Sequence, residues 1–193
     1  MNDRDRRQMT GIERKERQPV GMRLEMDSVT IFWLQLVLSC VVCALVAKWY
    51  VWPTLAKLPL NSALTPLIFV HVFRYVGMAL LVTGMVDPKL ARETLSAAAY
   101  GDLLAAALAL ASIFALRNRW HFAIALVWVF NTWGFIDLLN TLRSVVQTDL
   151  PSFNLGPVYF IYTFYAPTVV VTHLMIFWIL FKSKSWKRSA PRE

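Results

Sequence analysis

Charged residues are scarce in this sequence of 193 residues: Asp, Glu, Lys and Arg make up 17% of it, whereas hydrophobic residues make up 57%. A soluble domain typically has about 25% charged residues. The composition therefore excludes an ordinary soluble domain and indicates that lipid is much of the solvent of this chain.

Cysteine and the common catalytic motifs are also scarce or absent. Cys40 and Cys43 lie one helical turn apart in an apolar run, and no His, Asp or Glu stands nearby to complete a metal shell or to activate a thiol. We interpret both as buried small side chains and predict no metal site. No HExxH motif, P-loop, dinucleotide fingerprint or Ser, His and Asp spacing is present, so catalysis is the least favoured class of function.

Positive charge is the exception to this scarcity, because 20 Lys and Arg residues against 12 Asp and Glu residues give a net charge of +8. The placement of these charges decides between nucleic acid and lipid as a partner. Seven basic residues fall in residues 1–27 and five in the last 12 residues, which is typical of tails that touch anionic lipid headgroups. We therefore predict a lipid partner, a largely disordered basic tail at 1–27 and a second basic tail at 183–193.

Five long apolar stretches are each near the roughly 20 residues that a helix needs to cross a bilayer. We predict an all-α fold, an integral membrane bundle of five transmembrane helices within residues 28–182, in the cell membrane. Short loops predict antiparallel packing of consecutive helices. The predicted spans are residues 29–50, 62–86, 97–116, 120–142 and 157–181.

Two prolines and the odd number of spans add detail to this prediction. Pro53 is expected to end the first span, and Pro167 is expected to kink the fifth. Five spans place the two basic tails on opposite sides of the membrane. The distribution of Lys and Arg near the span ends is almost balanced and favours a cytoplasmic C-terminus only slightly.

Three charged side chains are predicted inside these spans, where a charge costs about 3 kcal/mol at the bilayer centre and usually finds a partner. Arg74 lies in the second span, Asp102 in the third and Asp137 in the fourth. Because the helix directions alternate, both acids belong to the same half of the membrane, within reach of Arg74. The predicted cluster carries one net negative charge, which a shared proton, a bound cation or protonation of one acid would remove. The alternative is an ordinary salt bridge between helices.

Two histidines suggest a second kind of site. His71 and His173 each lie about eight residues, or roughly 12 Å, from the same side of the membrane. Two imidazoles on facing helices are the axial ligands of a membrane-buried b-type haem, and a nearby Arg binds a propionate. The alternative is a pair of histidines that are hydrogen-bonded to neighbouring hydroxyl or carbonyl groups. We expect no cofactor, with haem as the alternative.

Small residues recur in the same spans. Ala97, Gly101, Ala105 and Ala109 form a ridge with a spacing of four residues, and such ridges let helix backbones approach closely. Gly77 and Gly134 are interpreted in the same way, as signals of helix assembly.

The polar positions form a pattern that resembles a known family. The segments HVFR at 71–74, YGD at 100–102 and NTWGFID at 131–137 are similar to those of an uncharacterised family of small bacterial multi-pass membrane proteins with no known activity. The resemblance covers the second to fourth spans. It implies that these polar residues belong to one design and that the chain comes from the bacterial inner membrane.

Three functional hypotheses stay open at this point. The favoured one is binding or transport of a small ligand, an ion or a proton by Arg74, Asp102 and Asp137, with Asn131 and His71 as further candidates. The second is a b-type haem redox protein that uses His71 and His173. The third is a structural or assembly subunit, alone or as a homo-oligomer, whose polar core has no ligand.

Overall fold

The computed structural model describes residues 26–183 and is helical almost throughout, with no strand in that range. The predicted basic tails fall largely outside these residues. The elements are α1 (Ser28–Val46), η1 (Ala47–Val51), α2 (Trp52–Leu55), α3 (Leu60–Val72), η2 (Phe73–Leu81), α4 (Arg92–Arg117), α5 (Ala123–Gln147), η3 (Leu150–Ser152), η4 (Gly156–Val158), η5 (Ile161–Tyr165) and α6 (Ala166–Phe181).

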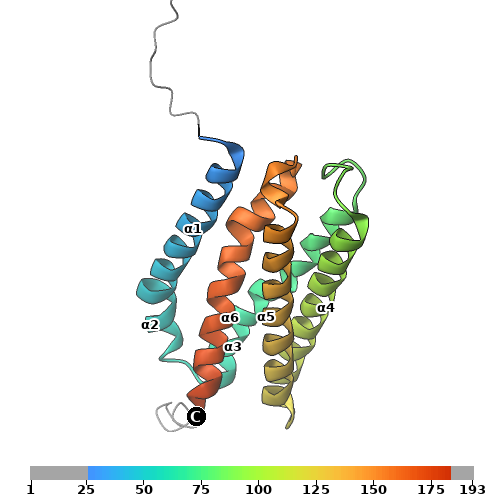
Figure 1. Cartoon of the computed structure of the whole chain (residues 1–193). Helices are drawn as coiled ribbons and strands as arrows, with labels where there is room; N and C mark the ends of the chain where they lie inside the picture. Colours follow the sequence, from blue (N-terminus) through green and yellow to red (C-terminus); the bar gives the residue numbers. More distant parts are fainter. Residues whose placement is uncertain (1–25, 184–193) are drawn as a thin grey trace, which may run out of the picture.

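Within the described range these elements join into five helical segments that are long and apolar enough to cross a membrane. They run alternately up and down, so that the first and last described residues lie at opposite ends of the bundle (Figure 1). Helix α1 stands at one side and contacts mainly α6 and η5 (Figure 1). The predicted spans 29–50, 62–86, 97–116, 120–142 and 157–181 correspond to Ser28–Leu55, Leu60–Leu81, Arg92–Arg117, Ala123–Gln147 and Gly156–Phe181.

Four predicted boundaries lie five residues from the observed ones, namely 50 against Leu55, 86 against Leu81, 97 against Arg92 and 142 against Gln147. Those of the second and third segments have identifiable reasons. The second segment stops at Leu81 rather than Val86, because Val82 is extended and Gly84 adopts a left-handed conformation with φ 84°. The third segment begins at Arg92, before the predicted start, because the sequence that precedes the apolar part is rich in good helix formers. Asp102 consequently lies well inside α4 rather than near its first turn.

Both prolines discussed above lie two residues after a π-helical turn. Pro53 follows η1 and Pro167 follows η5, and each is at the start of the next α-helical piece. A π-turn has a wider backbone, which accommodates a residue that lacks an N–H group. The prediction that Pro53 ends the first helix was therefore wrong, since the helix continues to Leu55.

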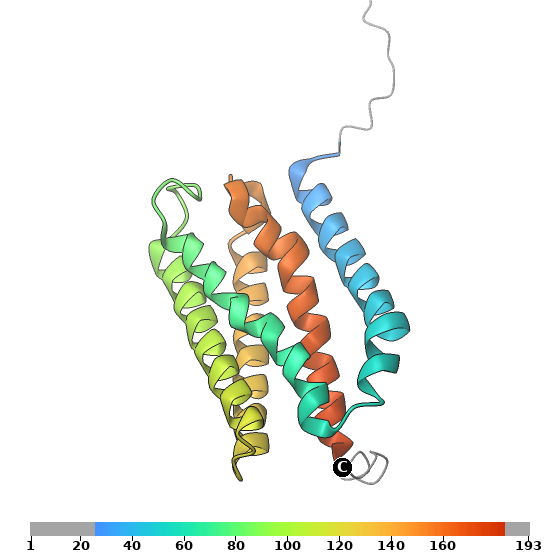
Figure 2. The ribbon, with the colours of Figure 1, turned by 180° about the vertical axis from the view of Figure 1, so that it is seen from behind.

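The second half of the second segment, η2, is a 3-10 helix of nine residues. Such helices rarely exceed about four residues, and their side chains align at a spacing of three. Arg74, Gly77 and Leu80 accordingly form one buried face of η2, and η2 packs against α4. Figure 2 shows α3 beginning beside the end of α6, and η2 ending beside the start of α4.

The buried apolar side chains form two clusters, one toward each end of the bundle. The first contains residues of α3, the second half of α4, the first half of α5 and the end of α6, including Leu64, Ile68, Ile113, Val127 and Ile176. The second contains residues near the opposite ends of these helices, including Phe32, Leu80, Leu95, Val145 and Leu155. The buried polar residues of α3, η2, α5 and α6 lie in sequence between the two clusters.

Candidate functional site

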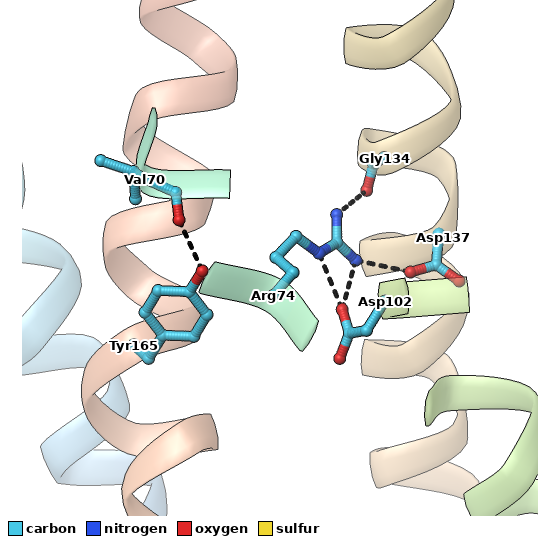
Figure 3. Close-up of polar contacts among 6 residues, drawn as sticks. All are labelled: Val70, Arg74, Asp102, Gly134, Asp137 and Tyr165. Atoms are coloured by element: carbon cyan, nitrogen blue, oxygen red, sulfur yellow. Dashed lines mark hydrogen bonds and ion pairs between the residues drawn. The ribbon is translucent and has the colours of Figure 1, made fainter. Parts of the chain in front are cut away.

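The centre of the candidate site is the guanidinium group of Arg74, whose side chain is 2% exposed. Its Nε donates to Oδ1 of Asp102 at 2.7 Å, and its Nη2 lies 2.7 Å from the same oxygen. The Nη2 group also donates to Oδ2 of Asp137 at 2.5 Å, and Nη1 donates to the backbone carbonyl of Gly134 at 2.9 Å (Figure 3). The structure therefore confirms the contact between the predicted Arg and both acids; a role in ligand binding stays a prediction.

The three charged residues belong to one layer of the bundle. Asp102 lies ten residues from the start of α4, and Asp137 lies ten residues from the end of α5, which is about 15 Å in each case at the α-helical rise. Arg74 lies seven residues from the end of η2, or about 14 Å at the 3-10 rise of roughly 2 Å. All three distances start from the same end of the bundle. The 3-10 form of η2 is what brings a residue only seven positions from the helix end to this depth.

Two glycines make room for the carboxylates. A Cβ atom on Gly77 would overlap with the side chain of Asp102, and one on Gly101 would overlap with the carboxylate of Asp137. From the sequence, such glycines were predicted to be signals of helix packing alone. The structure shows that they also leave the space in which the charged side chains lie.

The substitution Gly101→Ala is expected to destabilise the protein, because the added methyl group displaces the Asp137 carboxylate from Arg74. Overpacking of this kind typically costs about 1–3 kcal/mol. Thermal unfolding of the detergent-solubilised protein measures the effect. Ala107→Val, an addition at an exposed position of the same helix, is the control, and an equal loss in both variants would contradict the assignment.

Two buried histidines lie next to the charged cluster. The rings of His71 and His173 are in contact, with centroids 4.1 Å apart. The side-chain oxygen of Asn131 lies 2.8 Å from Nδ1 of His173, and Nε2 of His71 lies 3.0 Å from the hydroxyl of Thr172. Gly134 joins the two groups of residues, because a Cβ there would lie 3.0 Å from Nη1 of Arg74 and 3.2 Å from Nε2 of His173.

These contacts assign the neutral tautomer of the His173 imidazole. The amide nitrogen of Asn131 donates to the backbone carbonyl of His173 at 3.3 Å, so its oxygen accepts from Nδ1–H of His173. The Thr172 hydroxyl is within hydrogen-bond distance of Nε2 of His71 and of two backbone carbonyls of α6, and it can donate its proton to any of the three. Nε2 of the neutral His173 ring is thus a lone-pair acceptor. Neither this nitrogen nor Nδ1 of His71 has a partner among the described residues.

The comparison with known proteins assigns the chain to a family but not to an activity. Residues 31–181 match the family model described as a domain of unknown function, DUF8737. The chain belongs to this family. No curated protein and no solved structure matches it. The matched range contains every residue of the charged cluster and both histidines, so the site lies within the DUF8737 domain, in agreement with the predicted resemblance to an uncharacterised family.

The histidine pair of the DUF8737 domain does not fit the haem hypothesis. In a bis-histidine haem the iron lies about 2 Å from each ring nitrogen, so the two ring centroids are at least roughly 6 Å apart with the porphyrin between them. The observed 4.1 Å leaves no such space. The described residues also contain no group of three or more His, Cys, Asp or Glu side chains arranged to hold a metal ion.

Sequence reasoning missed three groups that hold the site. Thr172 precedes His173 in the sequence, and this polar dipeptide in an apolar helix was the available signal. Tyr165 donates to the carbonyl of Val70 at 2.6 Å (Figure 3), just before α3 changes into η2. The Gly134 carbonyl that binds Arg74 had no signal at all, because a backbone acceptor is present at every residue.

Proposed function

We propose that the DUF8737 domain is an integral membrane bundle whose cluster of Arg74, Asp102 and Asp137 binds a proton or a small cation. The observation that carries this proposal is that two carboxylates share one buried guanidinium, 2.7 and 2.5 Å from its nitrogens. With both acids ionised the cluster has one negative charge in excess. A proton or a monovalent cation supplies the missing positive charge.

The membrane location is supported by the outer surface of the bundle. Helix α1 buries a single residue, Phe32, and exposes a series of large apolar side chains. Contiguous apolar surface of this extent marks a membrane or partner interface, and each of the five segments has the length needed to span the bilayer. The resemblance noted in the sequence adds the bacterial inner membrane as the proposed location.

A second class of function, a purely structural subunit, predicts a cluster in which every charge is paired. The described contacts favour a binding site instead. Arg74 contacts Oδ1 of Asp102 and Oδ2 of Asp137. The second oxygen of each carboxylate takes no part in these ion pairs. One guanidinium cannot neutralise two carboxylates, and an uncompensated charge in a low-dielectric interior is costly.

The proposed topology is testable with reporter fusions. Fusions within residues 1–27 and after Glu193 are expected to report opposite sides of the membrane, because the five described segments alternate in direction. Alkaline phosphatase and fluorescent-protein reporters measure the two sides. Reporters on the same side would contradict five crossings.

The proposed binding of a proton or cation is testable by infrared spectroscopy of the purified protein. At neutral pH, where exposed carboxyl groups are ionised, a carbonyl-stretch band of a protonated carboxylic acid is expected in wild type and should fall as the pH rises further. Alternatively, if a cation is bound, added Na⁺ or K⁺ should raise the unfolding temperature of wild type and leave Asp137→Asn unchanged. The absence of such a band at neutral pH, together with no effect of either cation, would favour the structural subunit.

A further inference from the structure

A polar cavity between α4 and α5 leads from one end of the bundle to the charged cluster. It is a half-open hollow with a volume of about 300 Å³. Asp137 and Asn140 also line a second, more apolar hollow of about 350 Å³, which is formed by residues of α5 alone. The hollow between the two helices is lined by residues of the first two turns of α4 and the last turns of α5: Glu93, Thr94, Ala98, Asp137, Thr141 and Ser144. Its volume is enough for several water molecules.

On this basis we infer that Asp137 is the acid of the cluster that exchanges its proton with water, and that it does so through the cavity between α4 and α5. The inference rests on the proposed function and deepens it, because it names the acid, the species bound and the end of the bundle from which it enters. The outer end of the cavity is formed by Glu93 and Ser144, at the end of the bundle where α4 begins.

The contacts of the two acids separate their roles. Asp102 accepts from both Nε and Nη2 of Arg74 through one oxygen, whereas Asp137 accepts from Nη2 alone. The exposed fractions, 22% for Asp102 and 13% for Asp137, do not distinguish the acids. The lining of the two hollows does, since Asp137 belongs to both. Asp102 therefore holds Arg74 in place, and Asp137 faces the water.

The charges around Asp137 favour a proton over a metal ion. Arg74 of η2 pairs with Asp137 and with Asp102 of α4, and Glu93 of α4 and Arg143 of α5 line the hollows that Asp137 lines. His173 of α6, together with Tyr162 and Tyr165 of η5, lies near Arg74 or Asp102. A metal cation bound at Asp137 would lie beside the guanidinium and be repelled by it. A proton on Asp137 removes the excess negative charge without adding a neighbouring cation, and it needs only a chain of water and hydroxyl groups to reach the site.

On the side away from the cavity, the charged cluster is covered by the side chains of the first apolar cluster. Leu64, Ile68, Ile113, Val127 and Ile176 are at most 3% exposed, and Phe130 packs against both histidine rings. Packed apolar side chains exclude water. The cavity therefore provides access from one end only, which is the state expected of a proton-binding site that faces one side of a membrane at a time.

The test uses the full chain with Cys40 and Cys43 replaced by alanine, so that one new cysteine can be labelled with a neutral thiol reagent after folding. Thr94→Cys places the label in the cavity, and Ala107→Cys places it on an exposed face of the same helix. The measured quantity is the rate at which the carboxylic-acid infrared band shifts when the film is flushed with D₂O. Labelling at Thr94→Cys is expected to slow the shift at least tenfold relative to the unlabelled variant, and labelling at Ala107→Cys to leave it unchanged.

The assignment to Asp137 is tested in the same preparation. Asp137→Asn is expected to lose the band and Asp102→Asn to retain it. The inference alone is overturned if the band is lost in Asp102→Asn and retained in Asp137→Asn, if Thr94→Cys does not react with the reagent, or if its labelling leaves the exchange rate unchanged. A wild type that lacks the band and responds to no cation overturns the proposed function as well, so the two failures are distinguishable.

Discussion

Replacing Arg74 by Gln is expected to destabilise the detergent-solubilised protein by about 3–5 kcal/mol, because it leaves two carboxylates in a buried site without their counter-ion. Glutamine keeps much of the volume of the side chain and part of its hydrogen bonding, so the loss reports the charge rather than a cavity. Thermal unfolding, followed by circular dichroism at several pH values, measures the effect. The loss should shrink in acidic buffer, where the carboxylates gain protons.

The matched experiment combines Arg74→Gln with each acid in turn. Arg74→Gln with Asp102→Asn is expected to recover part of the lost stability, since the double variant removes one uncompensated charge that the single variant leaves behind. Asp137→Asn alone should leave stability nearly unchanged, because Asp102 still neutralises Arg74. Strictly additive effects of Arg74 with both acids would show that the three residues do not form one electrostatic unit.

Replacing Asn131 by Ala is expected to cost about 3 kcal/mol, the second largest effect. The substitution removes the acceptor of Nδ1–H of His173 and the donor to the carbonyl of His173, and it leaves a small cavity beside His173. The unfolding temperature of the purified protein measures this loss. Thr132→Ala, at an exposed neighbouring position of α5, is the control and should have little effect.

A second readout separates the orienting role of Asn131 from a general loss of packing. Without this acceptor, His173 is free to move its proton to Nε2, so the imidazole nitrogen resonances of labelled His173 should shift toward a mixture of tautomers. Asn131→Asp restores an acceptor at the same place and should restore the single tautomer. An unchanged tautomer in Asn131→Ala would show that the ring is held by other contacts.

Much of the fold follows from the sequence, and so does the heart of the site. Five apolar stretches of membrane length are a local property of the chain, and residues 26–183 form five long apolar helical segments. Arg74, Asp102 and Asp137 could be grouped because a charge is so costly among apolar residues that the few charges present must meet. The depth of each residue then follows from its position in its helix and the direction of that helix.

Other features depended on backbone variants that the hydrophobic pattern does not encode. An α-helix and a 3-10 helix have similar apolar residues, but the 3-10 spacing aligns Arg74, Gly77 and Leu80 in one row, whereas an α-helix would spread them over about 120°. The π-turns η1 and η5 are a second example of such a backbone variant. Because η1 precedes it, Pro53 lies within a continuing helix rather than at its end. The predicted end of the second span and the predicted start of the third were wrong for the related reason that loop conformation and helix propensity, rather than apolarity, decide where a helix stops and begins.

The sequence by itself determined that this chain is an apolar helical protein and that its few internal charges form one cluster, because both conclusions follow from the cost of each residue type in an apolar medium. Only the tertiary structure decided that His71 contacts His173, that glycines make room for the carboxylates and that a polar cavity ends at Asp137. These features depend on how each helix is rotated and how closely it approaches its neighbours. Rotation and approach are set by the packing of all the side chains together, so no single segment of the sequence specifies them.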